Sequence, residues 1–297
     1  MNEMSKEPGQ TITLPDGRQL GYLIVGEGKP AFWLSPNSRL QVLLLRRIAS
    51  SKHLQIIGVD RPGFGLSTYA PNRGISDFAS DVSCLADHLG LGKFILAGWC
   101  AGGPYVITCA ALLKQRVTQA LVIGGAFLPI DTLGMNRMNK IFLKFGTMPI
   151  IGTWITEYQR NMVLEMANDP DKYFKSKAGR DFLANCSEDH ARLLKPRSEI
   201  RDVLFRSELE AHLQGSNSIR AFISNMKLFK KSWNVDLSQI PPGMVHIWHG
   251  TADKFVPVSN AHKNAKAIPG AHLKIFENEG HALWLNHLEE IGELLNS

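Results

Sequence analysis

The chain has few of the features that mark secreted, metal-binding or membrane-spanning proteins. Its 297 residues include four cysteines, and no two of them are spaced as Cys-x-x-Cys. No cluster of cysteine and histidine resembles a zinc site, so we expect no metal and no other cofactor. The first ten residues are polar, unlike a signal peptide, and no apolar run is long enough to cross a bilayer. We therefore expect a cytoplasmic protein with reduced thiols and no membrane span.

Dense runs of Lys and Arg are also absent, although the net charge is +6. Residues 128–235 hold 17 Lys and Arg against 12 Asp and Glu, so five of the six net charges lie there. Charges spread in this way are typical of solvated helix faces, and we expect no nucleic-acid partner. A weaker alternative is a landing surface for an acidic partner, such as a phosphate-bearing acyl carrier.

Short apolar segments alternate with helical patterns in the first 127 residues and again after residue 235. Strands separated by helices of this length indicate a parallel sheet with right-handed crossovers. The triplet Pro15-Asp16-Gly17 predicts a turn, so the sheet should open with an antiparallel hairpin. Helices are predicted over residues 40–48, 76–89, 259–267 and 282–295, and another follows residue 102 and runs through residue 113. Strands are predicted over residues 11–14, 18–25, 31–34, 55–59, 94–97, 120–124, 244–248 and 273–276.

The middle of the chain breaks this alternation. Residues 128–235 show helical patterns and no convincing strand. We predict an α/β core made of residues 1–127 and 236–297, with residues 128–235 inserted as a helical unit. This unit is either a separate interaction domain or a lid. We favour the lid, because the unit leaves and re-enters at the carboxyl ends of strands, where open sheets bind ligands.

One pentapeptide, Gly98-Trp99-Cys100-Ala101-Gly102, lies between a predicted strand and a predicted helix. A small-x-nucleophile-x-small sequence in that position is typical of a nucleophile elbow, a turn so tight that its central residue is strained. Glycines are needed at its ends because a Cβ there would collide with neighbouring elements. The usual nucleophile is serine, and here the sequence predicts Cys100.

A nucleophile of this kind needs a base and an acid that orients the base. Two candidates follow Cys100 in the expected order of acid and then histidine. Asp253 comes directly after a predicted strand, and His281 lies on a loop after the last strand. We therefore predict a triad of Cys100, Asp253 and His281. Asp131 also follows a strand and remains an alternative acid.

Four motifs together resemble the α/β-hydrolase superfamily: residues 60–67 (Asp-Arg-Pro-Gly-Phe-Gly-Leu-Ser), the elbow, Gly250-Thr-Ala-Asp253 and Gly280-His281. The resemblance is to the lidded branch, which includes haloperoxidase-like esterases, proline iminopeptidases and C–C bond hydrolases. It covers nearly the whole chain outside the middle region. It implies an α/β-hydrolase fold: a mostly parallel sheet of about eight strands with helices on both faces and a helical lid.

Two positions depart from that family's pattern. Cysteine replaces serine at the elbow, as in dienelactone hydrolases and polyhydroxyalkanoate synthases. The family's His-Gly pair after the third strand is replaced by Ser35-Pro36. Since proline has no N–H, we expect the oxyanion hole to use Asn37, by main chain or side chain, together with the Ala101 N–H. Ser35 is a candidate pocket residue, and Trp99 either lines the pocket or packs under the sheet.

A cysteine nucleophile forms a thioester, which retains acyl-transfer potential. The sequence therefore predicts cysteine-dependent hydrolysis or transfer of an ester or thioester acyl group, from a small-molecule substrate that is free or carrier-bound. One alternative is a transferase, cyclase or lyase without net hydrolysis. The other is a catalytically inactive ligand-binding receptor, since fold alone does not define function. The oligomeric state stays open.

Overall fold

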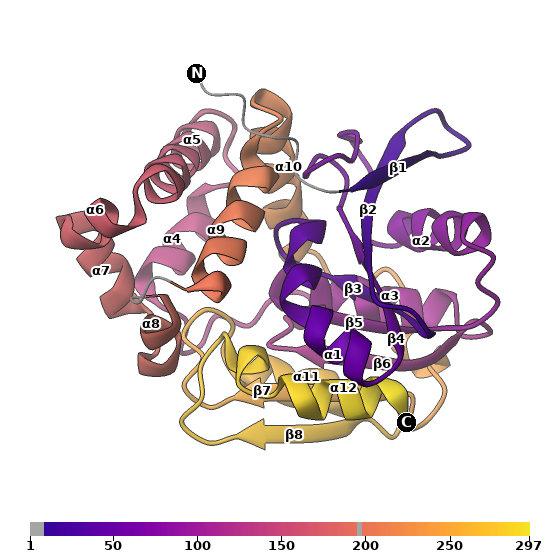
Figure 1. Cartoon of the computed structure of the whole chain (residues 1–297). Coiled ribbons are helices and arrows are strands. Elements are labelled where there is room, and N and C mark those ends of the chain that lie inside the picture. Colours follow the sequence, from indigo (N-terminus) through magenta and orange to yellow (C-terminus); the bar gives the residue numbers. More distant parts are fainter. Residues whose placement is uncertain (1–8, 195–197) are drawn as a thin grey trace.

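The structure, a computed structural model, describes residues 9–194 and 198–297. An eight-stranded sheet, in the order β1-β2-β4-β3-β5-β6-β7-β8, runs through the molecule (Figure 1). β1 and β2 are antiparallel to their neighbours, and the remaining pairs are parallel. The predicted sheet is thereby confirmed. The strands are β1 (Gln10–Thr13), β2 (Gln19–Val25), β3 (Lys29–Leu34), β4 (Leu54–Val59), β5 (Phe94–Trp99), β6 (Val117–Ile123), β7 (Val245–Gly250) and β8 (His272–Phe276).

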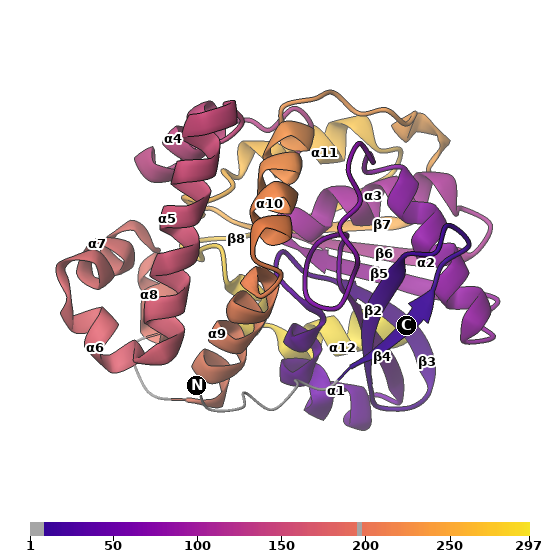
Figure 2. The same ribbon diagram turned by 90° about the horizontal axis from the view of Figure 1, so that it is seen from above.

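Helices cover both faces of the sheet, as Figure 2 shows from above. Alternate side chains along each strand point to opposite faces, and β3 illustrates this. Phe32 and Leu34 pack in one core with α2 (Asp77–His88), α3 (Gly103–Leu112) and α11 (Ser259–Ala267). Ala31 and Trp33 pack in the other with α1 (Arg46–Ser51) and α12 (Leu288–Asn296). Two apolar cores therefore hold the sheet rigid between them.

Two predicted helices differ in detail. The segment over residues 40–48 is divided between a 3₁₀ helix, η1 (Arg39–Leu45), and the start of α1. The last helix is divided into η4 (Leu283–Leu285) and α12. Asn286 and His287, which lie between these two elements, both bond to the carboxylate of Glu279 in the loop before η4.

The chain between β6 and β7 contains a group of helices that we call the helical insertion. Helices α9 and α10 lie nearest the sheet, and α5 packs against their other side (Figures 1 and 2). The members are α4 (Arg137–Phe145), α5 (Pro149–Asn168), α6 (Pro170–Lys175), α7 (Lys177–Asn185), α8 (Glu188–Leu194), α9 (Glu199–His212) and α10 (Ser216–Phe229).

A buried ion network joins α9 to the core. The Arg39 guanidinium donates to Asp60 and to Glu210, each at 2.8 Å, and all three residues are buried. Nearby, the hydroxyls of Ser38 and Ser207 lie 3.0 Å apart. Removing one member of a buried pair leaves an uncompensated charge and costs on the order of 3–5 kcal/mol. The loop after β3 and helix α9 are therefore held together as one unit.

The elbow after β5 lies against the end of β3. Leu34 pairs with Gly98 in the parallel ladder, and the start of α3 turns back over the same strand. A Cβ built on Gly102 would lie 1.9 Å from the Leu34 carbonyl oxygen. This approach brings residues 35–37 and 99–101 together at the carboxyl edge of the sheet.

We predict that Gly102→Ala is destabilised by about 3 kcal/mol, because the strand or the elbow must shift to admit the methyl group. Gly92→Ala is the matched control: a Cβ there meets nothing within 4 Å, so its cost should be within about 0.5 kcal/mol. Urea denaturation measures both. Equal stability of Gly102→Ala and the wild type would contradict the proposed contact.

Candidate active site

Cys100 occupies the strained position of the elbow. It follows β5, opens the short 3₁₀ turn η2 (Cys100–Gly102) and has a φ of +53°. A left-handed backbone costs a non-glycine residue about 1–2 kcal/mol and often marks a functional position. The side chain is half-buried, and the thiol is free. The thiol therefore stands at the sheet edge with limited access to solvent.

His281 and Asp253 form a buried pair beside Cys100. The His281 Nδ1 lies 2.7 Å from the Asp253 Oδ2. The other carboxylate oxygen of Asp253 accepts hydrogen bonds from the main-chain N–H groups of Phe255 and Val256, at 2.8 and 2.9 Å. Since Nδ1 is taken by the carboxylate, Nε2 is the ring nitrogen left for Cys100, whose side chain is near enough to raise the pKa of His281. Asp253 and His281 are therefore in direct contact, with Cys100 beside them.

The pair's electrostatics favour a charged histidine. Burial by itself would lower the pKa of His281, but the charge of Asp253, then that of Cys100 and hydrogen bonds to both, raise it well above its ordinary value. For Asp253, burial acts in the opposite direction and would by itself raise the pKa of the carboxyl group. The charge of His281 and hydrogen bonds to His249 and His281 instead lower it. This buried site therefore stabilises an imidazolium against a carboxylate.

The alternative acid, Asp131, lies elsewhere. Its carboxylate pairs with Lys263 at 2.7 Å, and this hydrogen bond lowers its pKa. The side chain of Asn260 also bonds to its main chain. The carboxylate that contacts His281 is that of Asp253, at 2.7 Å from its Nδ1.

A second histidine, His249, lies next to the carboxylate of Asp253. His249 is fully buried; its Nε2 lies 2.7 Å from the Val256 carbonyl oxygen and 3.4 Å from the Asp253 Oδ2. In the sequence, the only signal for His249 is its position four residues before Asp253 at the end of a strand. The contact restrains the loop that carries the acid.

Trp99 lies against the histidine. Its indole N–H donates to the His281 carbonyl oxygen at 2.7 Å, and the two rings are 5.2 Å apart. The same indole packs 5.7 Å from Trp284. Of the two roles considered from sequence, packing is the one these contacts describe, and it restrains the main chain of His281.

The loop after β3 is held by its own hydrogen bonds. The Ser35 hydroxyl donates to the Ser38 carbonyl oxygen at 2.7 Å, and the Arg61 guanidinium donates to the Pro36 carbonyl oxygen. The Asn37 side-chain amide donates to the Glu208 carboxylate of α9 at 2.6 Å. Since the amide is engaged, the main-chain N–H of Asn37, which bonds to no described residue, is the group left for an oxyanion.

Glu208 is itself an unusual carboxyl group. It lies half-buried between α9 and the loop after β3, and burial raises its pKa to about 7, against a smaller lowering effect of the Asn37 hydrogen bond. The carboxyl group that holds Asn37 therefore changes charge near neutral pH. Nothing in the local sequence singles out this glutamate.

A cavity of about 220 Å³ lies between α4, α5, α7 and the loop after β7. Phe255 is one of its lining residues, and the same ring stacks on His281, with 5.2 Å between centroids. Phe255 therefore joins the cavity to the candidate site. Its lining includes Met138, Phe142, Tyr158, Met162, Phe182 and Phe255.

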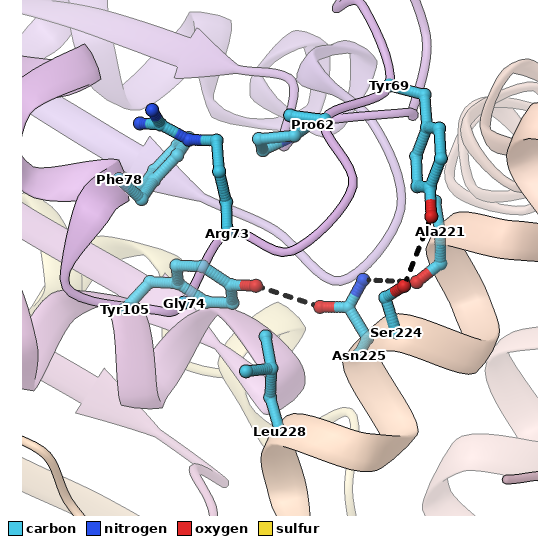
Figure 3. Close-up of a pocket in the computed structure, with 11 residues that line it drawn as sticks. Pro62, Tyr69, Arg73, Gly74, Phe78, Tyr105, Ala221, Ser224, Asn225 and Leu228 are labelled. Atoms are coloured by element: carbon cyan, nitrogen blue, oxygen red, sulfur yellow. Dashed lines mark hydrogen bonds between the residues drawn. The ribbon is translucent and has the colours of Figure 1, made fainter.

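A second cavity, of about 30 Å³, has room for little more than a water molecule. It lies between α10 and the core, where the Tyr105 hydroxyl donates to Asn225 at 2.8 Å (Figure 3). The Arg61 guanidinium donates to the same Asn225 oxygen at 2.6 Å. These bonds attach α10 to the core, so we assign this cavity to packing rather than to substrate.

The chain belongs to the alpha/beta hydrolase family, whose pattern it matches over residues 25–294. Among characterised proteins it is similar to the 2-hydroxy-6-oxononadienedioate/2-hydroxy-6-oxononatrienedioate hydrolase of Escherichia coli. The two are 23% identical over 252 residues, which are 81% of this chain and 75% of the enzyme. The family and its relatives make the protein a hydrolase by class.

Solved structures show the same fold. An alpha/beta hydrolase fold protein from Nakamurella multipartita aligns with a TM-score of 0.72 and 21% identity, over 97% of this chain and 99% of that one. A meta-cleavage product hydrolase from Pseudomonas fluorescens aligns with a TM-score of 0.62 and 22% identity, over 97% and 96%. A thermophilic esterase from Thermogutta terrifontis aligns with 0.63 and 18%, over 97% and 96%.

We predict that Asp253→Asn lowers the pH at which His281 loses its proton, because the carboxylate charge is the largest influence that raises this pKa. Cys100→Ala should lower it less. In the wild type, stability from the charged histidine is complete below about pH 6.5 and is lost as pH rises through the raised pKa. Titration of the His281 ring by NMR measures the shift, and an unchanged midpoint in Asp253→Asn would refute this account.

We predict that Glu208→Gln removes a pH dependence of stability. The folded pKa of about 7 exceeds the ordinary value of 4.5, so the contribution of Glu208 is complete below pH 4.5 and is lost as pH rises through about 7. Relative to the variant, the wild type should lose free energy of unfolding over this range. Glu199→Gln, an exposed position on the same helix, is the control. Parallel curves for wild type and Glu208→Gln would contradict the prediction.

Proposed function

We propose that the protein is a cysteine-dependent hydrolase that acts through an acyl-Cys100 intermediate. The observation that carries the proposal is the buried contact of His281 with Asp253, beside the strained Cys100 whose side chain influences the pKa of His281. Each group has the neighbour that nucleophilic catalysis needs, and the base is oriented by an acid that cannot turn away. The family and the esterase neighbours support the same class of reaction.

In the first half of the reaction, the Cys100 sulfur attacks the substrate carbonyl carbon and the thiol proton passes to His281 Nε2. The oxyanion is stabilised by the main-chain N–H groups of Asn37 and Ala101. The intermediate then collapses: the bond to the leaving group breaks, and the leaving group takes the proton from His281. In the second half, His281 removes a proton from water, the water oxygen attacks the thioester carbonyl, and the Cys100 thiol is released with the acid product.

Because the proposed intermediate is a thioester, a molecule other than water could also accept its acyl group. A thioester keeps most of the acyl-transfer potential of a thioester substrate, so a second thiol, alcohol or amine can collect the acyl group. The altered loop at Ser35-Pro36 favours keeping this transferase alternative. The loop is joined to the insertion by the hydrogen bond between Asn37 and Glu208, so a shift of α9 would also move the oxyanion hole.

We also propose that the helical insertion, within residues 128–235, acts as a lid, with residues 1–127 and 236–297 as the core. The cavity behind Phe255 supports this role because α4, α5 and α7 supply most of its walls. Its methionine and aromatic lining suits a medium-sized apolar acyl group. A small-molecule ester or thioester, free or carrier-bound, is the proposed substrate.

Incubation with a panel of acyl thioesters and p-nitrophenyl esters, followed by intact-protein mass spectrometry, tests the proposal. We expect the wild type to gain one acyl mass per chain and Cys100→Ala to gain none. Cys84→Ala, which removes a half-buried thiol from α2, should acylate as the wild type does.

The lifetime of the adduct separates the alternatives. Rapid loss in water identifies a hydrolase, whereas an adduct released only by an added acceptor identifies a transferase. Saturable binding with no adduct and no turnover, while Cys100 still reacts with iodoacetamide, would replace the proposal by a ligand receptor.

A further inference from the structure

The first half of α5 presents large apolar side chains to solvent. Ile150 is 85% exposed and Trp154 is 75% exposed, and Ile151 and Tyr158 are also exposed. Positions 150, 154 and 158 lie one above another on a helix, so they form a continuous row. The opposite side of α5 packs on α9 and α10. Exposed apolar rows of this kind mark interaction sites, and we call this one the α5 stripe.

The neighbouring helix α4 adds positive charge. Arg137, Lys140 and Lys144 are exposed at positions that share one face of α4. None forms an ion pair with a residue that the structure describes. Residues 133–160 hold four Arg and Lys and a single acidic residue, Glu157. The α5 stripe is therefore bordered by free cationic side chains.

The same two helices form the mouth of the cavity behind Phe255. Met138 of α4 is 48% exposed and Tyr158 of α5 is 60% exposed, and both also line the cavity. If an apolar surface lay against the α5 stripe, an apolar acyl chain could pass from that surface into the cavity without entering water. The path ends at Phe255, whose ring stacks on His281.

We infer that the α5 stripe and the cationic face of α4 dock on an anionic lipid surface, from which an apolar acyl chain enters the cavity. The acyl part of this inference rests on the proposed function; the docking part does not. The interface of an anionic bilayer offers both partners: its acyl region can take up Trp154 and Ile150, and its negatively charged headgroups can pair with the basic residues. A second copy of the chain fits less well, because it would bring the same cations together.

The geometry is that of a helix lying on a membrane rather than crossing it. Within the described residues, no helix combines the length and the apolar character that a bilayer span requires. The second half of α5 is polar on its outer side, with Asn161 and Glu165 exposed. Insertion would therefore be confined to the first turns of α5.

Co-sedimentation of the full chain with phosphatidylcholine vesicles, with and without phosphatidylglycerol, tests the docking. We expect binding that requires the anionic lipid and weakens with added salt. The double variant Ile150→Ser/Trp154→Ser should bind at least about tenfold more weakly. Removing Lys140 or Lys144 by substitution with Gln should cost about fivefold each. Leu112→Ser, an exposed leucine of α3, is the control and should bind as the wild type does.

Activity is a separate readout. The double variant should lose hydrolysis of a long-chain ester held in the vesicles and keep that of a soluble short-chain ester. Vesicle binding without any acyl-Cys100 would support the docking while refuting the proposed function. Absence of binding to anionic vesicles would overturn the docking, whatever the activity. A dimer that the double variant dissociates in sedimentation velocity, without lipid, would overturn it in favour of a second copy.

Discussion

The approach of the elbow to β3 determines where every group of the candidate site lies. Gly102 can sit against the Leu34 carbonyl oxygen only because it has no Cβ. In the same turn Cys100 adopts a left-handed backbone, with a φ of +53°. The loops after β3, β7 and β8 end at the same edge, since parallel strands present their carboxyl ends together. One close backbone contact thereby places nucleophile, oxyanion loop, acid and base within reach of each other.

The helical insertion is connected to this edge unevenly. Around Arg39, buried charges and hydroxyls join α9 to the loop after β3, and Asn225 joins α10 to Arg61 and Tyr105. Helices α4 and α5 lie farther from the sheet and enclose the larger cavity (Figure 2). Because α9 also carries Glu208, a movement of the insertion would change the hydrogen bond of Asn37. The helices that line this cavity and the loop after β3 are thus connected through α9 and α10.

The contacts around Asp253 hold the charged form of His281. Asp253 is buried, receives two main-chain N–H groups and has His249 next to its carboxylate, so its charge is held in place. That fixed negative charge, 2.7 Å from the His281 Nδ1, raises the pKa of the histidine although burial alone would lower it.

The sequence by itself determined where the strands lie along the chain, a mostly parallel sheet, and the elbow with the candidate acid and histidine after it, because these depend on local patterns of apolar residues and glycine. It left Asp131 and Asp253 both open, and it did not indicate Glu208 or His249. Only the tertiary structure determined the order of the strands in the sheet. It alone also shows which carboxylate contacts His281 and that Glu208 bonds to Asn37, since Asn37 and Glu208 are 171 positions apart and meet through the packing of α9 on the core. The α5 stripe is a similar case. Apolar residues at helical spacing predict a helix, but whether they face a core or solvent depends on which neighbours the fold places against them.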